Sequence, residues 1–275
     1  MVFACVTFTG ITEEQKEVLT ALLSEIGFEG YEETDTEFKA FIGKEVLDII
    51  ALDSVVENLA LNYTLSEIEP QNWNALWEGN FEPVIVDDFC AIRADFHGSL
   101  KDQAKYEIVI TPKMSFGTGH HATTYMMIQL MRNTPMQGKS VLDYGCGTGV
   151  LAILAERLGA VYTMAIDIDE WAYQNTLENV LNNNCKKIEV VQGELDRIDT
   201  RTFDIILANI NKHVLQFSME HMYRALHSEG VLLLSGILHE DEDDIVSLAV
   251  SCGFRKLAVI KRGSWMAISF TRGYE

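Results

Sequence analysis

The sequence has few basic residues for its length. It contains 21 Lys and Arg against 41 Asp and Glu, which gives a formal net charge of −20. A surface of this sign repels nucleic-acid phosphates, so direct nucleic-acid binding is disfavoured. The same surface attracts a basic, lysine-rich protein. Acidity that serves only solubility is the alternative, and composition alone leaves both interpretations open.

Paired cysteines and long apolar runs are also lacking. The five cysteines are widely spaced and form no C-x-x-C pair, which disfavours a disulfide framework and a zinc cluster. The N-terminus has no basic region followed by an apolar run, and the apolar run at 230–238 is too short to cross a bilayer. The composition therefore predicts a cytoplasmic protein with no membrane contact and no metal.

The first 70 residues carry much of the acidity and predict a small separate domain. They hold 15 acidic and 3 basic residues. Thr12 is suited to cap a helix at 12–27 that Gly27 ends, and a second helix is predicted near 53–60. Together with strand-like runs near 3–9, 28–34, 37–43 and 61–69, the order βαββαβ predicts a ferredoxin-like α+β domain.

A short linker helix is predicted at residues 71–80, because Trp73 and Trp77 lie four residues apart and share one helix face.

From residue 81 to 275 strand-like and helical segments alternate, which predicts a doubly wound, mostly parallel α/β sheet. Only Gly263 and Ser264 separate the last two strand-like runs, so these are predicted to form a hairpin with an antiparallel last strand. This arrangement resembles the Rossmann-like fold of class I S-adenosylmethionine-dependent methyltransferases.

A glycine-rich loop lies at residues 141–150, with the sequence VLDYGCGTGV. Glycine recurs at every second position from Gly145, and Val150 stands where a dinucleotide-binding G-x-G-x-x-G motif has its third glycine. Asp167 ends the next strand and can accept hydrogen bonds from the ribose hydroxyls of an adenosine. Asp169 is the competitor, but it is better placed to cap the next helix. The pattern predicts S-adenosylmethionine in preference to NAD.

Another strand-like run, FDIILAN, ends in Asn209. At the carboxyl end of a central strand its amide can orient an incoming amine or hold the cofactor. Capping the following helix is the structural alternative.

The stretch MSFGTGHHATT at 114–124 allows several interpretations: a metal site, a phosphate loop, a catalytic histidine or a loop that covers a ligand. Adjacent histidines point in different directions, and no acid or cysteine stands at ligand spacing, which disfavours a metal. His121 can serve as a base or as a structural residue, and no catalytic residue is assigned.

These segments together resemble the bacterial methyltransferases of large-subunit ribosomal protein L11. The similarity covers NWNALWEGNFEPV, FGTGHHATT, DYGCGTGVLAI, AIDID and ILANI, and FGTG-x-H-x-TT before the glycine loop is its most specific part. The resemblance implies methylation of lysine side chains and of an N-terminal amine on that ribosomal protein. It also implies substrate recognition by residues 1–70 and catalysis by residues 81–275. The cofactor contacts that it implies are Thr124, Gly145, Asp167 and Asn209.

Two departures from the family pattern bear on the substrate end of the site. Ala122 replaces a proline, and residues 211–213 replace a proline-containing segment. Rival functions are a class I methyltransferase acting on another protein, an RNA or a small molecule, and a non-catalytic S-adenosylmethionine-binding module.

Overall fold

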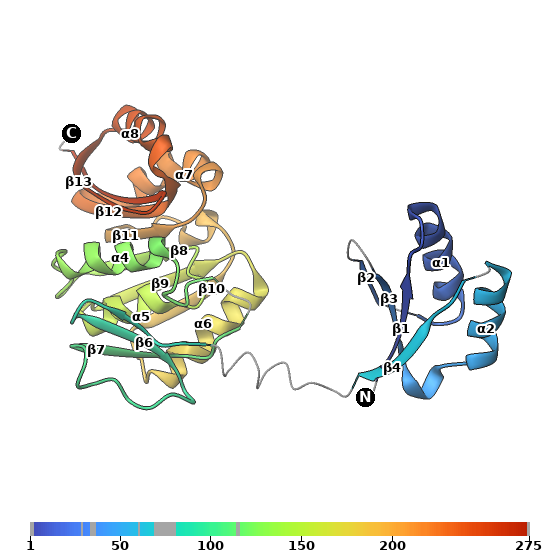
Figure 1. Ribbon diagram of the computed structural model, residues 1–275. Helices are drawn as coiled ribbons and strands as arrows, with labels where there is room; N and C mark the ends of the chain where they lie inside the picture. Colours follow the sequence, from blue (N-terminus) through green and yellow to red (C-terminus); the bar gives the residue numbers. More distant parts are fainter. Residues whose placement is uncertain are drawn as a thin grey trace. The chain divides into compact units, whose positions relative to one another are not determined.

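The chain forms two units, Met1–Asn80 and Phe81–Glu275, and each has its own hydrophobic core (Figure 1). The computed structural model describes residues 3–28, 30–33, 37–59, 61–68, 81–113 and 116–273. The linker helix predicted at 71–80 lies outside these residues. Within them, no helix is both long enough and apolar enough to cross a membrane.

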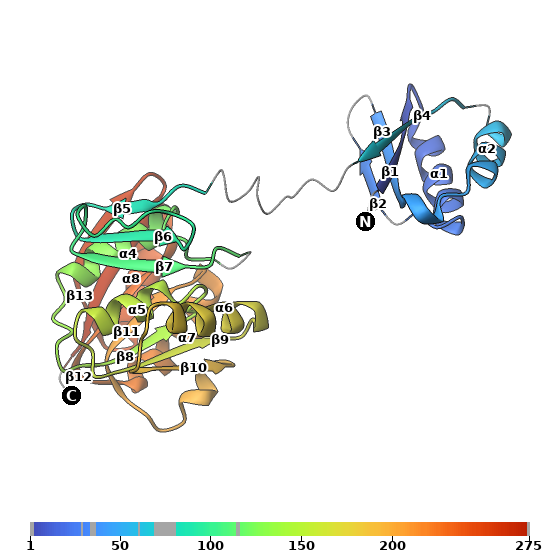
Figure 2. The same ribbon diagram turned by 90° about the horizontal axis from the view of Figure 1, so that it is seen from below.

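The N-terminal unit is an antiparallel sheet with two helices on one face (Figures 1 and 2). Its strands pair in the order β2-β3-β1-β4, so the first strand lies between the third and the fourth. This is the βαββαβ arrangement that the sequence pattern predicts. The elements are β1 (Phe3–Thr9), α1 (Glu13–Glu25), β2 (Gly30–Glu33), β3 (Glu37–Gly43), η1 (Lys44–Val46), α2 (Ile49–Asn58) and β4 (Thr64–Ile68).

Side-chain caps determine where the two helices of this unit begin. Thr12 caps α1 as predicted: its hydroxyl accepts from the N–H of Gln15, whose side chain accepts from the N–H of Thr12. Helix α2 begins at Ile49, four residues before the predicted start. Asp48 explains the earlier start, because its carboxylate accepts hydrogen bonds from the N–H groups of Ile50 and Ala51.

The larger unit is built on a seven-stranded sheet in the order β10-β9-β8-β11-β12-β14-β13. Strand β14 runs antiparallel to both of its neighbours, and the other pairs are parallel, which confirms the predicted C-terminal hairpin. All seven strands fall on the strand-like runs of the sequence. Their bounds are β8 (Ser140–Tyr144), β9 (Tyr162–Asp167), β10 (Ile188–Gln192), β11 (Phe203–Asn209), β12 (Leu226–Leu238), β13 (Phe254–Arg262) and β14 (Trp265–Arg272).

Helices cover both faces of this sheet, because alternate residues of each buried strand point to opposite sides. In β11, Ile205 and Leu207 face one core, while Ile206 and Ala208 face the other. Helices α4 (Ala122–Arg132), α5 (Val150–Arg157) and α6 (Glu170–Asn182) border the first core. Helices α7 (Lys212–Ala225) and α8 (Glu242–Ser251) border the second, and η2 (Leu195–Ile198) and η3 (His239–Asp241) are short turns.

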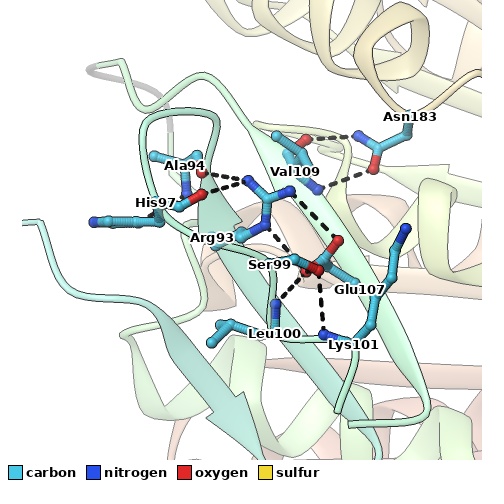
Figure 3. Close-up of polar contacts among 9 residues, drawn as sticks. All are labelled: Arg93, Ala94, His97, Ser99, Leu100, Lys101, Glu107, Val109 and Asn183. Atoms are coloured by element: carbon cyan, nitrogen blue, oxygen red, sulfur yellow. Dashed lines mark hydrogen bonds and ion pairs between the residues drawn. The ribbon is translucent and has the colours of Figure 1, made fainter. Parts of the chain in front are cut away.

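A three-stranded sheet before α4 was not predicted from the sequence. It consists of β5 (Val84–Val86), β6 (Cys90–Ala94) and β7 (Tyr106–Ile110), with β6 and β7 parallel. Figure 3 shows how the connection between the parallel strands is held. Arg93 of β6 pairs with Glu107 of β7 over 3.1 Å and donates to the carbonyls of Ala94 and His97. The connecting loop thus takes its shape from a largely buried ion pair.

Candidate cofactor site

The carboxyl ends of three neighbouring strands form the centre of the candidate site. In the large sheet β8 lies between β9 and β11, so the chain order reverses between β8 and β11. Open α/β sheets bind ligands in the crevice at such a switch point. Gly145 follows β8, Asp167 ends β9 and Asn209 ends β11. The fold therefore places three of the four predicted cofactor contacts at one edge.

The glycine loop turns tightly against its neighbours. Gly147 has a φ of 56°, and a Cβ added there would lie 2.3 Å from the carbonyl oxygen of Phe116. A Cβ on Gly145, whose φ is 73°, would lie 2.3 Å from Cγ2 of Ile210. Both positions therefore require glycine, for conformation and for space. The N–H groups of Gly145 and Cys146 both donate to the carbonyl of Ile166 in β9.

The carboxylate of Asp167 is held in place by two backbone groups. Its Oδ2 accepts from the N–H of Gly147 at 2.9 Å, and its Oδ1 accepts from the N–H of Asp169 at 3.0 Å. The carboxylate is therefore oriented beside the glycine loop, where it can accept hydrogen bonds from ribose hydroxyls. Asp169 caps α6 as predicted, because its Oδ1 accepts from the N–H of Ala172 at 2.9 Å.

Asn209 and Thr124 meet on the other side of the glycine loop from Asp167. Asn209 Nδ2 donates to Thr124 Oγ1 over 3.3 Å. The other end of the amide, Oδ1, is buried and has no hydrogen-bond partner among the described residues. Asn209 does not cap α7; Asn211 does, by accepting from the N–H of Val214. A buried acceptor without a partner costs free energy, so a ligand that donates a hydrogen bond to it at this strand end gains binding energy.

The described part of the stretch 114–124 begins at Phe116 and packs on the glycine loop. Thr148 makes both connections: its N–H donates to the carbonyl of Phe116 at 2.9 Å, and its hydroxyl donates to that of Gly117 at 2.7 Å. Two motifs about 30 residues apart therefore form one structure. A phosphate loop binds its ligand through backbone N–H groups. The contacts of Phe116 and Gly117 with the glycine loop use their carbonyl oxygens, so they give the phosphate-loop interpretation no support.

The two histidines of this stretch have different surroundings. His121 is the N-cap of α4, with Nδ1 accepting from the N–H of Thr123, and its ring packs edge-on against Phe116 and Trp265. His120 pairs with the hydroxyl of Thr118 instead. His121 thus has a structural task that occupies its Nδ1. Within the described residues no three His, Cys, Asp or Glu side chains gather as a metal-binding group.

A buried carboxyl lies beneath the glycine loop. Asp143 of β8 is 1% exposed, and its Oδ2 accepts from the N–H of Ala152 in the first turn of α5 at 3.0 Å. Burial raises the pKa of Asp143 from its ordinary 3.8 to about 7; the hydrogen bond from Ala152 opposes this shift and the charge of Asp167 adds to it. Burial likewise raises the pKa of the Cys146 thiol well above its ordinary value, which disfavours a nucleophilic thiolate in this loop.

Comparison with known proteins gives the family. The family model "Ribosomal protein L11 methyltransferase (PrmA)" matches residues 5–273. The chain belongs to this family. It is 39% identical to the ribosomal protein L11 methyltransferase of Phocaeicola vulgatus, over 96% of this chain and 97% of that protein. It is 40% identical to that of Porphyromonas gingivalis, over 94% and 91% of the two chains.

A solved structure agrees with this assignment. The crystal structure of the ribosomal protein L11 methylase from Lactobacillus delbrueckii subsp. bulgaricus is 25% identical and superposes with a TM-score of 0.64. The superposition covers 70% of this chain and all of that one. The large unit therefore has the class I methyltransferase fold that the strand pattern predicts.

Membership of the L11 methyltransferase family does not by itself show which contacts shape the site. The sequence interpretation missed three contacts of the glycine loop: Thr148 with Gly117, Gly145 with Ile210, and Thr148 with Asn179. The first two contacts join distant segments and leave no local pattern. A signal for the third was present, because Asn175, Asn179 and Asn183 recur at a spacing of four residues.

Proposed function

We propose that this chain transfers methyl groups from S-adenosylmethionine to lysine side chains and to the N-terminal amine of a basic ribosomal protein, ribosomal protein L11. Family membership supports the reaction and the substrate protein. The site supports an amine acceptor, since Asn209 presents a buried, unpaired carbonyl oxygen at the crevice. That unpaired oxygen is the single observation that carries the proposal for the site.

The described residues fit S-adenosylmethionine, the cofactor of class I methyltransferases. Asp167 offers carboxylate oxygens for the ribose hydroxyls, and Gly145, with its φ of 73°, lets the backbone turn tightly at the end of β8 beside the crevice. Thr124 offers a hydroxyl for the amino-acid end, and the Asn209 amide oxygen has two lone pairs, which can accept from the cofactor and from the incoming amine. When bound, the cofactor supplies a methyl group activated by its sulfonium sulfur. No described residue contradicts this assignment.

The chain's own contribution to the reaction is position. Thr124 takes the donor end of the Asn209 amide, so the acceptor end is fixed toward the crevice. An amide oxygen is a weak base, and it orients an amine without removing its proton. A lysine amine titrates near ~10.4 in water and has to lose a proton before it attacks. His121 Nδ1 is occupied as a helix cap, so we propose that this proton leaves to water.

The N-terminal unit is proposed to dock the substrate protein. Residues 1–70 hold 15 acidic and 3 basic residues, and a lysine-rich partner is complementary to that charge. In the sequence, residues 71–80 precede the catalytic unit, Phe81–Glu275. We propose that a linker here lets one catalytic site reach several amines of the docked protein. The acidic net charge argues against direct contact with RNA.

Transfer of a tritiated methyl group tests this function directly. The purified chain is incubated with labelled S-adenosylmethionine and with separated ribosomal proteins and ribosomal RNA. We expect label in ribosomal protein L11 alone, at lysine and N-terminal amines after peptide mapping. Label in RNA or in a different protein contradicts the proposed substrate. Cofactor binding without any transfer supports a non-catalytic module instead.

A further inference from the structure

Side chains of one helix, rather than another strand, cover the outer edge of β7. This strand is the last in the order β5-β6-β7. Figure 3 shows Asn183, which follows α6, facing the backbone of Val109. Its Oδ1 accepts from the N–H of Val109 at 2.9 Å, and its Nδ2 donates to the carbonyl at 2.6 Å. At Thr111, just after β7, Asn179 Oδ1 accepts from the N–H at 2.7 Å and Asn175 Nδ2 donates to the carbonyl at 3.0 Å.

The spacing of the two elements makes this pairing possible. Four residues of helix rise about 6 Å, and two residues of strand rise about 6.6 Å. Asn183 at Val109 and Asn179 at Thr111 therefore stay in register, and Asn175 binds the carbonyl of the same Thr111. All three side chains are buried, and without them the backbone groups at this edge would be left unpaired.

Asn179 has a second contact that its two neighbours in the series lack. Its Nδ2 donates to the carbonyl of Thr148 in the glycine loop at 2.8 Å. Thr148 is fully buried, and its N–H and hydroxyl bind the carbonyls of Phe116 and Gly117. Every polar group of Thr148 is therefore engaged. Thr111 binds Asn179, and Phe116, the first residue of the FGTGHHATT stretch, binds Thr148, so the hydrogen bond between Asn179 and Thr148 links these two segments.

We propose that Asn179 is a positioning residue for the cofactor. Its amide fixes the glycine loop against the end of β7, and Thr148 transmits that position to Phe116 and Gly117. Gly147, the residue before Thr148, donates its N–H to the carboxylate of Asp167. The hydrogen bond from Asn179 to Thr148 therefore also helps to position that carboxylate. The inference rests on the proposed function only in taking S-adenosylmethionine as the ligand.

A matched pair of variants tests the proposal. Asn179→Ala and Asn183→Ala each remove a buried amide that binds the edge of β7, so both are expected to lower the melting temperature. Only Asn179→Ala also frees the carbonyl of Thr148. We expect its Kd for S-adenosylmethionine, measured by calorimetry, to rise about tenfold, which corresponds to one lost hydrogen bond. Asn183→Ala should stay within about twofold of the wild-type protein.

Hydrogen exchange on the wild-type protein gives an answer even if a variant does not fold. Saturating S-adenosylmethionine should slow exchange at the N–H groups of Thr111 and Thr148 more than at that of Val109. Equal changes at all three amides, or equal affinities of the two variants, would overturn the positioning role alone. Failure of the wild-type protein to bind the cofactor would overturn both this inference and the proposed function.

Discussion

Asn209 Nδ2 donates to the hydroxyl of Thr124 across 3.3 Å, which joins the end of β11 to the first turn of α4. The contact determines which end of the amide a ligand meets. Since the nitrogen is occupied, the oxygen is the free group, and it is buried. A buried acceptor without a partner lowers the free energy of unfolding, so a donor supplied by a ligand is a source of binding energy.

Replacing Asn209 with alanine should therefore impair the site more than the fold. We expect Asn209→Ala to lower kcat/KM for methyl transfer by about 10- to 100-fold, from loss of one oriented hydrogen bond. The melting temperature should change little or rise, because an unpaired buried acceptor is removed. Steady-state kinetics and thermal unfolding measure the two effects.

Asn211→Ala is the matched control for this variant. Asn211 caps α7, so its loss should cost about 1 kcal/mol of unfolding free energy. Its effect on transfer should be much smaller than that of Asn209→Ala. Equal losses of transfer in both variants would contradict the role assigned to Asn209.

A second prediction separates the two aspartates after β9. Asp167→Ala removes the carboxylate that Gly147 and Asp169 orient, and the Kd for S-adenosylmethionine should rise about 10- to 100-fold. Asp169→Ala removes only the cap of α6, so it should lower the unfolding free energy by about 1 kcal/mol. Calorimetric titration of both variants with S-adenosylmethionine measures the two Kd values. A larger rise in Asp169→Ala than in Asp167→Ala would assign cofactor binding to Asp169 instead.

The sequence predicted the large sheet well because its inner strands are largely buried apolar runs, and the more exposed edge strands β10 and β13 are strand-like runs as well. The hairpin of β13 and β14 followed from the two residues between them, Gly263 and Ser264. The three-stranded sheet escaped prediction for a physical reason. Strand β5 spans only Val84–Val86, and β6 and β7 are parallel but joined by a loop instead of a helix. The alternation of strands and helices that marks a parallel sheet is therefore absent there.

The candidate site was predictable only where one residue acts on its own. Asp167 and Asn209 are recognisable because each ends a buried strand. Asn179 was not recognisable, because a polar residue in a helix normally indicates a solvent-exposed face. Its burial depends on β7, which local pattern did not reveal. The four-residue spacing of Asn175, Asn179 and Asn183 places them on one helix face, but it does not reveal that a strand edge about 70 residues away covers that face.

The third prediction concerns pH and Asp143. Its folded-state pKa is about 7, above the ordinary 3.8, so the folded state binds more protons between these values. The stability contribution of Asp143 is therefore complete at low pH and is lost as the pH rises toward 7. The amide side chain of an Asp143→Asn variant keeps an oxygen for the N–H of Ala152 and does not titrate.

The difference in unfolding free energy between the two proteins isolates this effect from other carboxyls. We expect Asp143→Asn to gain stability relative to the wild-type protein between about pH 5 and about pH 8, by on the order of 2 kcal/mol. Urea unfolding at the two pH values measures it. A difference that does not change with pH would show that Asp143 does not titrate in this range.

The fourth prediction concerns the ion pair of Arg93 and Glu107. The side chains are 14% and 7% exposed. Burial opposes the charge of Glu107, but hydrogen bonds from Arg93, Leu100 and Ser99 outweigh it and hold the pKa of that carboxyl below its ordinary value. Glu107→Ala leaves a largely buried guanidinium without its partner, so we expect a loss of about 3 kcal/mol of unfolding free energy.

The exposed pair of Glu220 and Arg224 provides the comparison for Glu107→Ala. Both of its side chains are about two-thirds exposed. Glu220→Ala should change the unfolding free energy by less than about 0.5 kcal/mol, because water screens exposed ion pairs. Urea unfolding curves of the two variants give both values. Similar losses would show that burial of the Arg93 pair does not matter.

The last prediction separates docking from catalysis. The unit Phe81–Glu275 has its own hydrophobic cores and contains the predicted cofactor contacts. A chain reduced to these residues should bind S-adenosylmethionine with a Kd within about twofold of the full-length value. Its kcat/KM on the ribosomal protein should fall by at least about tenfold, because the acidic docking surface is gone.

In the full-length chain, added salt should raise the KM for the protein substrate and leave the cofactor affinity nearly unchanged, since salt screens attraction between exposed charges. Undiminished methylation by the shortened chain, or a KM insensitive to salt, would rule out electrostatic docking by the N-terminal unit.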